Sequence, residues 1–532
     1  GGGGGPGGMG GGAAGGRAHR APGDVEAPAG PVDPGTLVWR RVHPVTPLVR
    51  GWKILAVLLV IGFQQLDFNP ANAAEVVDRV GLGGIGLVVL VVAALGFGYA
   101  ALAWRMTRYA VGEETVHLAS GVLFRQQRAA RLDRIQAIDT AQPLLARMLG
   151  LTELKIEVAG GQDSAVRLSF LRDEEAQDLR NELLARAAGL DRSGPDGAAL
   201  PAAAAPEREL VHVPPGRLLE SLARSVGTLI ALLVLIGAVT AVVVTREPAV
   251  IFSLIPVVIG VVGAVWARFT REFNFRLAQS PDGIRLRHGL LEARAQTVPP
   301  GRVQAVRISQ PLLWRGRDWW RVEVNVAGYV QQGERQVDTV LLSVGDRDEA
   351  LVALWLVLPD LGVPEARQVL DEALEGRTTD RGFVVSPPPA VWLDPVSWRR
   401  NGFLVTERAL LVRTGRLFRR LVVVPHEKTQ SIALRQGPWQ RRLGVASVVL
   451  HSTPGPVVPL VPHVSESDAG HLVTEQAGRA RQARATATPD RWMSAPAPGL
   501  QPSAPQLAPP PPLPAPPPPV PPGPPPPPPS DR

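Results

Sequence analysis

The residues that could perform chemistry are few, and they form no recognised catalytic pattern. Gly81-Leu-Gly83-Gly-Ile-Gly86 matches the G-x-G-x-x-G pattern of dinucleotide sites. Such a site needs a strand before it and a soluble helix after it, whereas this run opens a long uncharged segment. No phosphate-binding G-x-x-x-x-G-K-[ST] loop occurs. The chain has no cysteine, which excludes disulfides, zinc–thiolate sites, iron–sulfur clusters and thiol catalysis.

The nine histidines do not suggest a metal or catalytic site. None has the H-x-x-x-H or H-E-x-x-H spacing of a metal site, and a structural role suits His43 better than metal ligation. No G-x-S-x-G nucleophile elbow occurs. No charged side chain lies deep in the apolar runs, as a transporter or proton relay would require. We therefore predict a non-enzymatic protein with no catalytic residue, no cofactor and no metal.

Arginine supplies most of the positive charge. The formal net charge is +8, and lysine occurs only at Lys53, Lys155 and Lys428. This balance favours anionic partners, either acidic lipid or nucleic acid. Nucleic acid is disfavoured because no recognition helix or stacking motif accompanies the charge. A solvated Arg-rich surface is the alternative to a binding role. The candidate contacts for lipid headgroups or an acidic partner are Arg128, Arg131, Arg134, Trp314, Arg315, Arg317, Trp439, Arg441 and Arg442.

Four uncharged runs predict membrane segments. Ser225–Thr245 and Pro248–Ala267 are close to the roughly 20 residues that a spanning helix needs, and a third long run follows Arg79. The weakest run, Ile54–Leu66, spans only if it extends back to Leu48, and an interfacial or re-entrant segment is the alternative. Basic residues concentrate on one side of these runs. The positive-inside rule then places both termini and the polar segments in the cytoplasm, at the cell (inner) membrane.

Three copies of one β-rich unit make up most of the polar sequence. A glycine is followed 15 residues later by a glutamine and 6 residues after that by a second glutamine, at Gly121, Gln136 and Gln142, at Gly289, Gln304 and Gln310, and at Gly415, Gln430 and Gln436. An aligned basic residue follows at Arg147, Arg315 and Arg441. Short Val-, Ile- and Leu-rich runs such as Glu153–Val158 predict strands, and each copy ends on a helical pattern such as Asp173–Ala188. We expect a rolled sheet closed by one amphipathic helix.

The architecture resembles that of bacterial pleckstrin-homology-like membrane proteins, the bPH2 or YdbS/YdbT type. Trp39-Arg-Arg-Val-His43-Pro44-Val-Thr-Pro47-Leu-Val-Arg50 is similar to the motif that opens such proteins, and Val213-Pro-Pro-Gly-Arg217-Leu-Leu is similar to its second occurrence. The resemblance covers about residues 38 to 485 and implies a seven-stranded PH-like barrel capped by a C-terminal helix. The third copy departs from the pattern because no membrane hairpin precedes it. The resemblance also implies a role in envelope maintenance or antimicrobial resistance, with a smaller companion protein of the same family.

The predicted fold class is an α+β membrane protein with transmembrane helical hairpins and three PH-like β-barrel or sheet modules, each closed by a C-terminal helix. The expected segments are a disordered Gly/Ala-rich N-terminus (1–37), a first transmembrane hairpin (38–107), PH-like module 1 (108–190), a linker (191–210), a second transmembrane hairpin (211–269), PH-like module 2 (270–362), a linker (363–382), PH-like module 3 (383–486) and a Pro-rich disordered tail (487–532). The tail should be extended polyproline, either a partner-docking segment or a passive spacer.

These features lead to one functional hypothesis and two alternatives. The first is a scaffold or protein-interaction platform at the inner leaflet, whose partners are the lipid bilayer and a homologous or smaller PH-like protein, with self-association left open. The second is recognition of anionic lipid headgroups by the Arg/Trp loops. A transporter component is the third, and the nearly unbroken apolar runs disfavour it.

Overall fold

The structure is a computed structural model that describes residues 39–46, 70–112, 115–121, 126–132, 135–158, 166–187, 207–246, 248–280, 283–327, 339–376 and 382–486. The chain divides into two compact units, residues 1–132 and residues 133–532. The predicted segment Ile54–Leu66, the residues before Trp39 and the Pro-rich tail lie outside the described residues.

The first unit contains a four-stranded antiparallel sheet and one long helix. Its elements are β1 (Trp39–Arg41), α2 (Pro70–Met106), β2 (Arg108–Val111), β3 (Thr115–Ser120) and β4 (Gln126–Arg131), and the sheet order is β1-β2-β3-β4. β1 pairs with β2, with Trp39 opposite Ala110. The indole of Trp104, near the end of α2, donates a hydrogen bond to the carbonyl of Val42 at 2.9 Å. These contacts hold the base of α2 to the sheet.

The second unit begins with a seven-stranded sheet of order β7-β6-β5-β11-β10-β9-β8. Its elements are β5 (Ile135–Pro143), α3 (Leu144–Met148), β6 (Leu151–Val158), β7 (Val166–Arg172), α4 (Asp173–Ala187), β8 (Arg208–Val213), α5 (Pro215–Ala223), α6 (Val226–Thr245), α7 (Pro248–Glu272), β9 (Phe275–Ser280), β10 (Gly283–His288) and β11 (Glu292–Val298). All neighbouring strands in this sheet are antiparallel.

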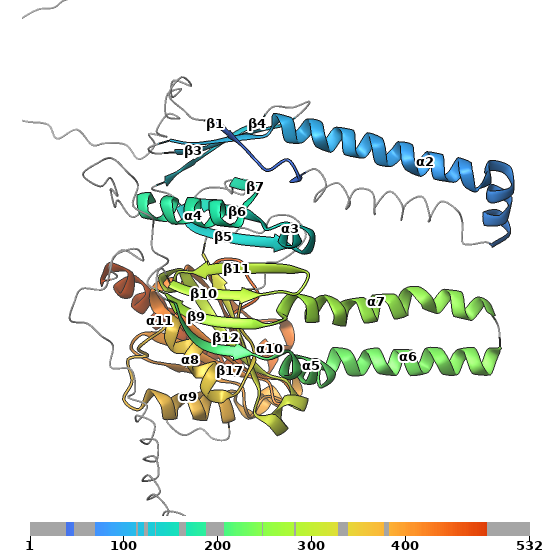
Figure 1. Ribbon diagram of the computed structural model, residues 1–532. Coiled ribbons are helices and arrows are strands. Elements are labelled where there is room, and N and C mark those ends of the chain that lie inside the picture. The colour runs from blue at the N-terminus through green and yellow to red at the C-terminus, as the bar shows by residue number, and fades with distance from the viewer. Residues whose placement is uncertain are drawn as a thin grey trace, which may run out of the picture. The chain divides into compact units, whose positions relative to one another are not determined.

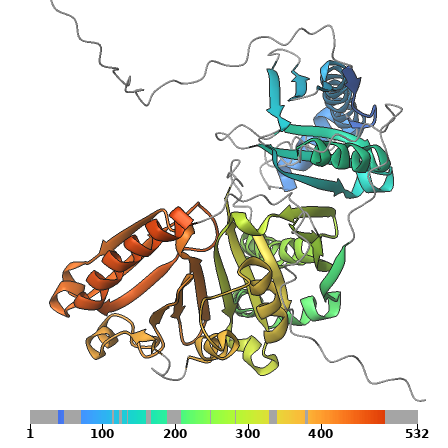
Figure 2. The same cartoon turned by 90° about the vertical axis from the view of Figure 1, so that its left-hand side faces the viewer.

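A second seven-stranded sheet, of order β14-β13-β12-β18-β17-β16-β15, and a three-stranded sheet, of order β19-β20-β21, follow. Their elements are η2 (Pro300–Arg302), β12 (Val303–Gln310), η3 (Leu312–Arg317), β13 (Trp320–Val326), β14 (Thr339–Gly345), α8 (Arg347–Val357), α9 (Ala366–Glu375), β15 (Val384–Val385), η5 (Pro388–Trp392), β16 (Gly402–Val405), β17 (Ala409–Thr414), β18 (Arg419–Pro425), η6 (His426–Lys428), β19 (Ser431–Arg435), α10 (Pro438–Arg442), β20 (Val445–His451), β21 (Leu460–Ser465) and α11 (Glu466–Thr486). In Figure 2, α11 lies along the three strands that precede it.

The predicted PH-like modules are sheets rather than the seven-stranded barrels that the family resemblance implies, because the sheets of the described residues are open and shared between modules. The second module places β8–β11 in one seven-stranded sheet and β12–β14 in the next. β5 of the first module pairs with β11 of the second, and β12 of the second pairs with β18 of the third. The predicted PH-like strands and C-terminal helices are present, but edge strands that would close one barrel pair across modules instead.

The hydrophobic core of the second module lies between its two sheets. It combines Phe275 and Leu277 of β9 with Ile308 of β12, Val322 of β13 and Leu351 of α8. The capping box of α8, in which Asp346 accepts from the Glu349 N–H, fixes where this covering helix begins. A second core lies under α11 in the third module. The second module is therefore stabilised by burial between two sheets, and both of these sheets continue into neighbouring modules.

The predicted membrane hairpins are insertions within the sheets rather than segments that precede them. β1 lies before α2 but pairs with β2, and β8 lies before α5–α7 but pairs with β9. The predicted hairpin ranges 38–107 and 211–269 therefore each include strand residues. In the third module the connection between β15 and β16 is only η5 and a series of turns. The structure thus shows where the third copy lacks its hairpin.

α6 and α7 lie side by side and extend from the body of the second unit (Figure 1). Within the described residues one helix, Val226–Val244, is long and apolar enough to cross a membrane, and Leu90–Met106 forms a shorter apolar helix. Ser225 caps α6 by accepting a hydrogen bond from the Thr228 N–H. The multi-pass arrangement remains a prediction.

The linker predicted over residues 363–382 contains a helix instead. α9 buries Val369, Leu370, Ala373 and Leu374 on one face and contacts β18. These four residues recur at helical spacing, and their burial against the core explains why the segment is ordered.

Candidate functional site

One short turn recurs after the second signature glutamine of every module. It is α3 in the first module, η3 in the second and α10 in the third. The glutamine side chain donates a hydrogen bond that holds the start of the turn; the acceptors are Thr152 Oγ1 for Gln142 (2.7 Å), Asp318 Oδ1 for Gln310 (3.0 Å) and the Val445 carbonyl for Gln436 (3.3 Å). The repeat motif therefore has a structural cause, since the same amide fixes an equivalent turn three times.

Apolar side chains on these turns are exposed. They are Leu144, Leu145 and Met148 on α3, Leu312 and Leu313 on η3, and Trp439 on α10. Met148 is 76% exposed and Trp439 is 70% exposed. Large apolar residues gathered on a surface mark a contact with a partner or a membrane. The turns are therefore the strongest candidate contact surface in the second unit.

Hairpins from the following module bring further exposed apolar residues to two of these turns. The Leu144 N–H donates to the carbonyl of Leu291 at 2.7 Å, which joins α3 to the hairpin between β10 and β11. Arg315 of η3 donates to the carbonyl of Leu417 at 3.2 Å, in the hairpin between β17 and β18. Leu291, Leu417 and the adjacent Phe418 are exposed. Consecutive modules thus build each of these two apolar surfaces together.

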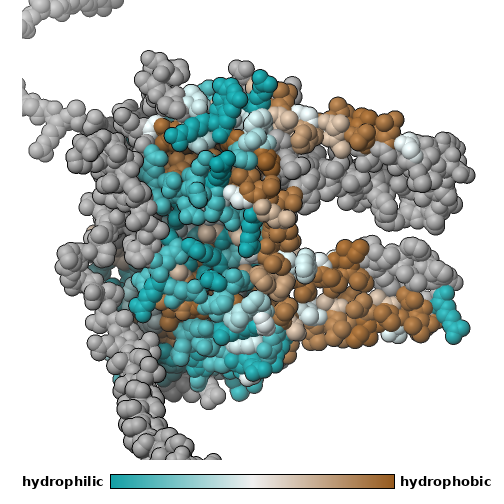
Figure 3. Space-filling model, viewed as in Figure 1, coloured by the Kyte–Doolittle hydropathy of each residue, from teal (hydrophilic) through white to brown (hydrophobic). Residues whose placement is uncertain are grey.

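The turn of the second module lies at the base of the membrane-type helix. The indole of Trp314 in η3 donates to the carbonyl of Ser221 in α5 at 2.9 Å, and α5 leads directly into α6. Figure 3 shows hydrophobic residues on α6, on α7 and on the end of the body from which they extend. The exposed apolar residues of η3 therefore lie at the end of the module that a membrane crossed by α6 would face.

The Arg/Trp loop predicted as a contact in the second module is largely part of the packing. Trp314 is only 1% exposed, so its side chain is not presented to a partner. Arg315 also donates to the carbonyl of Arg416, and Arg317 pairs with Glu220 at 3.0 Å. Burial, followed by the charges of Arg419 and Arg416, lowers the pKa of Arg315. Arg315 consequently ties η3 to the third module.

The other candidate contacts are placed differently. Trp439, Arg441 and Arg442 lie together on α10 and are exposed. Arg128 and Arg131 lie on β4 of the first unit, opposite Leu118 and Thr115 in the register with β3. Arg134 lies outside the described residues. A contact role for these arginines remains a prediction, and α10 is where an aromatic and two basic side chains are presented together.

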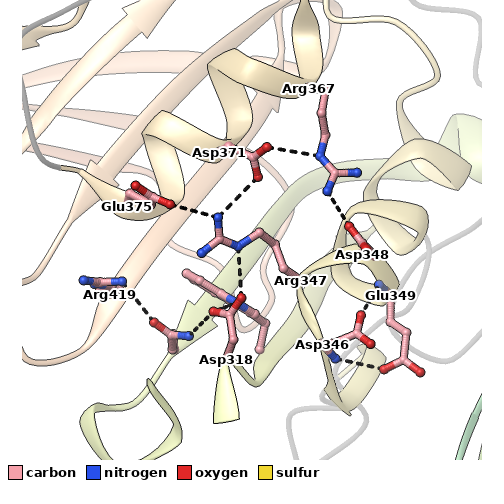
Figure 4. Close-up of polar contacts among 11 residues, drawn as sticks. Asp318, Asp346, Arg347, Asp348, Glu349, Arg367, Asp371, Glu375 and Arg419 are labelled. Carbon is pink, nitrogen blue, oxygen red and sulfur yellow. Dashed lines mark hydrogen bonds and ion pairs between the residues drawn. The ribbon is translucent and has the colours of Figure 1, made fainter. Parts of the chain in front are cut away.

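A network of charged and polar side chains joins the second module to the third (Figure 4). Arg419 of β18 donates to Gln310 Oε1 at 3.3 Å, and Gln310 donates to Asp318. Asp318 pairs with Arg347 of α8 at 3.1 Å, and Arg347 pairs with Glu375 of α9 at 3.1 Å. Burial alone would lower the pKa of Arg347, but the hydrogen bond to Glu375 and the charge of Asp318 raise it. The signature glutamine therefore also couples two modules.

Several residues of the apolar surface were not singled out in the sequence. The pair Leu144-Leu145 aligns with Leu312-Leu313 directly after the repeated Gln-Pro, so the repeat alignment could have identified both. Trp392 was also missed: it ends η5, in the connection that replaces a hairpin, and is 82% exposed. No sequence signal distinguishes it from buried Trp314, because exposure depends on tertiary packing.

Metal binding has no support among the described residues, where no group of three or more His, Asp or Glu side chains could hold an ion. Sequence comparisons point instead to a known family. The family model described as Bacterial PH domain matches residues 57–187, 228–377 and 374–480. No solved structure matches the chain.

One curated relative is the UPF0699 transmembrane protein YdbT of Bacillus subtilis (strain 168), which is 23% identical over 151 residues. The match covers 28% of this chain and 30% of the relative, so less than a third of the relative's own length is involved. The family matches are more extensive, cover most of the chain, and correspond to the three repeats found above. By its sequence, the chain belongs to the Bacterial PH domain family, with three matches to the family along its length.

Proposed function

We propose that this protein is a non-enzymatic scaffold at the inner leaflet of the cell membrane, where its PH-like modules form one platform for other proteins. The observation that carries the proposal is the sharing of sheets between modules. β5 pairs with β11 and β12 pairs with β18, so backbone hydrogen bonds connect the modules at two junctions. Modules on flexible linkers would move independently, whereas a continuous sheet holds binding surfaces at a constant spacing.

Attachment to the membrane is supported by the long apolar helix and the surface around it. α6 is almost entirely apolar and little of it is buried. The exposed leucines of η3 lie at its base, and exposed apolar side chains at a membrane surface gain free energy by leaving water. Arg217 and Arg224 precede α6, while Arg268 and Arg271 end α7. These flanking charges support a hairpin whose modules are cytoplasmic.

A cysteine-accessibility experiment tests the orientation. The chain lacks cysteine, so a single cysteine at exposed Gln482 of α11 provides one reactive thiol in the full-length protein. A membrane-impermeant maleimide should label Gln482→Cys only after the cells are opened. Labelling on intact cells would place the modules outside and contradict the proposal. Arg246→Cys, at the end of α6, should be labelled from outside in the same experiment.

Crosslinking in the native membrane tests the scaffold itself. A photoreactive residue at position 439 or 392 should capture specific proteins, because both side chains are exposed on the third module. The matched control is position 320, where the tryptophan side chain is fully buried and should capture none. A protein that is recovered without any neighbour and without self-association would not be a scaffold.

We also propose a second role, contact with anionic lipid headgroups, because α10 combines an exposed tryptophan with Arg441 and Arg442. Each basic residue near an acidic bilayer contributes about 1 kcal/mol. In full-length protein reconstituted into lipid, a fluorophore on Trp439→Cys should be quenched by lipid-borne quenchers more strongly in acidic than in neutral lipid. Arg441→Gln with Arg442→Gln should remove the difference. A fluorophore on Gln482→Cys is the control, and equal quenching in both lipids would refute this role.

A further inference from the structure

In the part of the chain that the structure describes, the first and third modules each have one strand that could join a further module but has no neighbouring strand on one side. β12 lies between β13 and β18, and β5 lies between β6 and β11. Their counterpart in the third module, β19, pairs with β20 but is the last strand of its sheet. At the other end, β4 is the counterpart of β11 and β18 and is the last strand of the first sheet. In the described residues, therefore, the junction-forming strand of the third module and that of the first module are both edge strands.

The two junctions within the chain have the same register. In the second junction Val306 lies opposite Val423 and Gln310 lies opposite Arg419. Alignment of the repeat motifs matches β12 with β5 at an offset of 168 residues (304 to 136). It matches β18 with β11 at an offset of 126 residues (415 to 289). These shifts place residue 142 opposite residue 293, and the structure indeed pairs Gln142 with Ala293. The two junctions therefore have the same register relative to the repeat motif.

The same rule specifies a third junction. β12 corresponds to β19 after a shift of 126 positions (304 to 430), and β18 corresponds to β4 after a shift of 294 positions (415 to 121). Applied to the observed register, these shifts place Ile432 opposite Ala129, Leu434 opposite Gln127 and Arg435 opposite Gln126. In this antiparallel register every residue of β19 lies opposite a residue of β4.

The side chains of β19 retain the apolar pattern of a covered junction. Val306 and Ile308 of β12 are fully buried where β18 pairs with them. The equivalent residues of β19 are Ile432, which is half-buried, and Leu434, which is 48% exposed. An edge strand that stays in water usually carries charged residues or proline to prevent pairing, whereas β19 exposes Leu434 and has one charged residue, Arg435, at its end. The pattern is that of a strand that a neighbour covers.

From these observations we propose that β19 of one chain pairs with β4 of a second copy of the same chain, in the register given above. The partner is a second copy because β4 is itself an edge strand and is long enough to place a residue opposite every residue of β19 in this register. The two surfaces differ, so the contact is head-to-tail and extends into a ring or a filament. This inference rests on the proposed scaffold function and gives the platform a means of growth along the membrane.

A pair of lysine substitutions tests the surface. Leu434→Lys should weaken self-association of the full-length protein in detergent by at least about tenfold, equivalent to ~1.4 kcal/mol, because it introduces a charge at the edge. Leu460→Lys is the matched control, since Leu460 is 40% exposed on β21, at the opposite edge of the same sheet. Mass measurement across a concentration series should show assemblies for the wild type and for Leu460→Lys. A wild type that is monomeric throughout, or equal effects of both substitutions, would overturn the proposal.

Disulfide crosslinking tests the register. Two differently tagged copies are co-expressed, one with Leu434→Cys and the other with Gln127→Cys, and their membranes are oxidised. This pair, or the adjacent pair Arg435→Cys with Gln126→Cys, has the closer cross-strand spacing that a disulfide requires. Both should crosslink more than Leu434→Cys with Gln126→Cys, whose side chains point to opposite faces. Crosslinks without register preference contradict the proposal, as does a bond formed only within one chain when both cysteines are placed in it.

These results are distinguishable from failure of the scaffold itself. If the wild type does not self-associate but residues 439 and 392 still capture other proteins, the edge-pairing inference fails and the scaffold function stands. If in-register crosslinks form between copies but no other protein is captured, edge pairing stands and the role as a platform for other proteins fails.

Discussion

Trp314 and Trp439 lie on equivalent turns of consecutive modules, yet only one should matter for stability. Trp314 is 1% exposed, packs edge-on against Trp319 with ring centroids 6.4 Å apart, and donates to the Ser221 carbonyl at 2.9 Å. Truncation of a buried tryptophan to alanine costs about 3–5 kcal/mol. Loss of the hydrogen bond leaves the Ser221 carbonyl without this donor, which makes the upper part of that range the expected value.

The assay is thermal unfolding of the full-length protein in detergent, followed by circular dichroism. In a domain of this size each kcal/mol shifts Tm by roughly 2–4 °C, so Trp314→Ala should lower Tm by on the order of 10 °C. Trp314→Phe retains most of the volume but loses the indole donor, and it should cost about 1–3 kcal/mol. Trp439→Ala should change stability by less than about 0.5 kcal/mol, because the side chain is 70% exposed.

The comparison of the two tryptophans can refute the reasoning in either direction. A Tm for Trp314→Ala equal to that of the wild type would show that η3 is not held to α5 by this side chain. If Trp439→Ala lowered Tm as much as Trp314→Ala, then α10 would be packed against another part of the protein and would not be a free contact surface.

Three further substitutions test other parts of the structure. Burial, followed by the charge of Glu157, raises the pKa of Asp139 to about 7. The folded state therefore loses stability as the pH rises from about 4 to 7. Asp139→Asn should become more stable than the wild type across that window, by up to about 4 kcal/mol at pH 8. Gly415→Ala should cost more than about 1 kcal/mol, because φ is +74° and the added Cβ would lie 2.1 Å from the Phe418 carbonyl oxygen. Leu370→Ala should cost about 2–5 kcal/mol, as expected of a buried helix residue and not of a linker. Thermal unfolding measures all three, and is repeated at pH 4 to 8 for Asp139→Asn.

Each of these substitutions has a control in the same protein. Asp178→Asn lies on the exposed face of α4 and should have little effect on stability. Gly478→Ala lies within α11 with open space around the new Cβ, so it should stabilise by about 0.5–1 kcal/mol. Gln368→Ala lies on the exposed face of α9 and should have little effect. A stability difference for Asp139→Asn that is constant with pH, a neutral Gly415→Ala or a harmless Leu370→Ala would each contradict the packing described above.

The local pattern of the sequence determined the repeated unit, the membrane-type run and the strands. Fixed intervals between Gly415, Gln430 and Gln436 recur in all three copies. Two of these residues meet a local requirement: the glycine makes a turn with positive φ, and the second glutamine anchors the next turn. The run Ser225–Thr245 identifies α6 because its composition is uniformly apolar over the length of a helix. The signal for these features lies within a few residues along the chain.

Tertiary structure decided how the units join and which side chains are available. Whether β12 pairs with a strand of its own module or with β18 depends on competition between distant edges with similar hydrogen-bonding groups, and alternation of side chains within one strand does not report on it. Trp314 and Trp392 are the same residue type and both lie in short 3-10 helices, η3 and η5, yet one is buried against α5 and the other is 82% exposed. Exposure of a side chain is set by what packs on it from elsewhere in the chain. For that reason the repeat could be predicted from the sequence, whereas the shared sheets and the exposure of the apolar side chains required the fold.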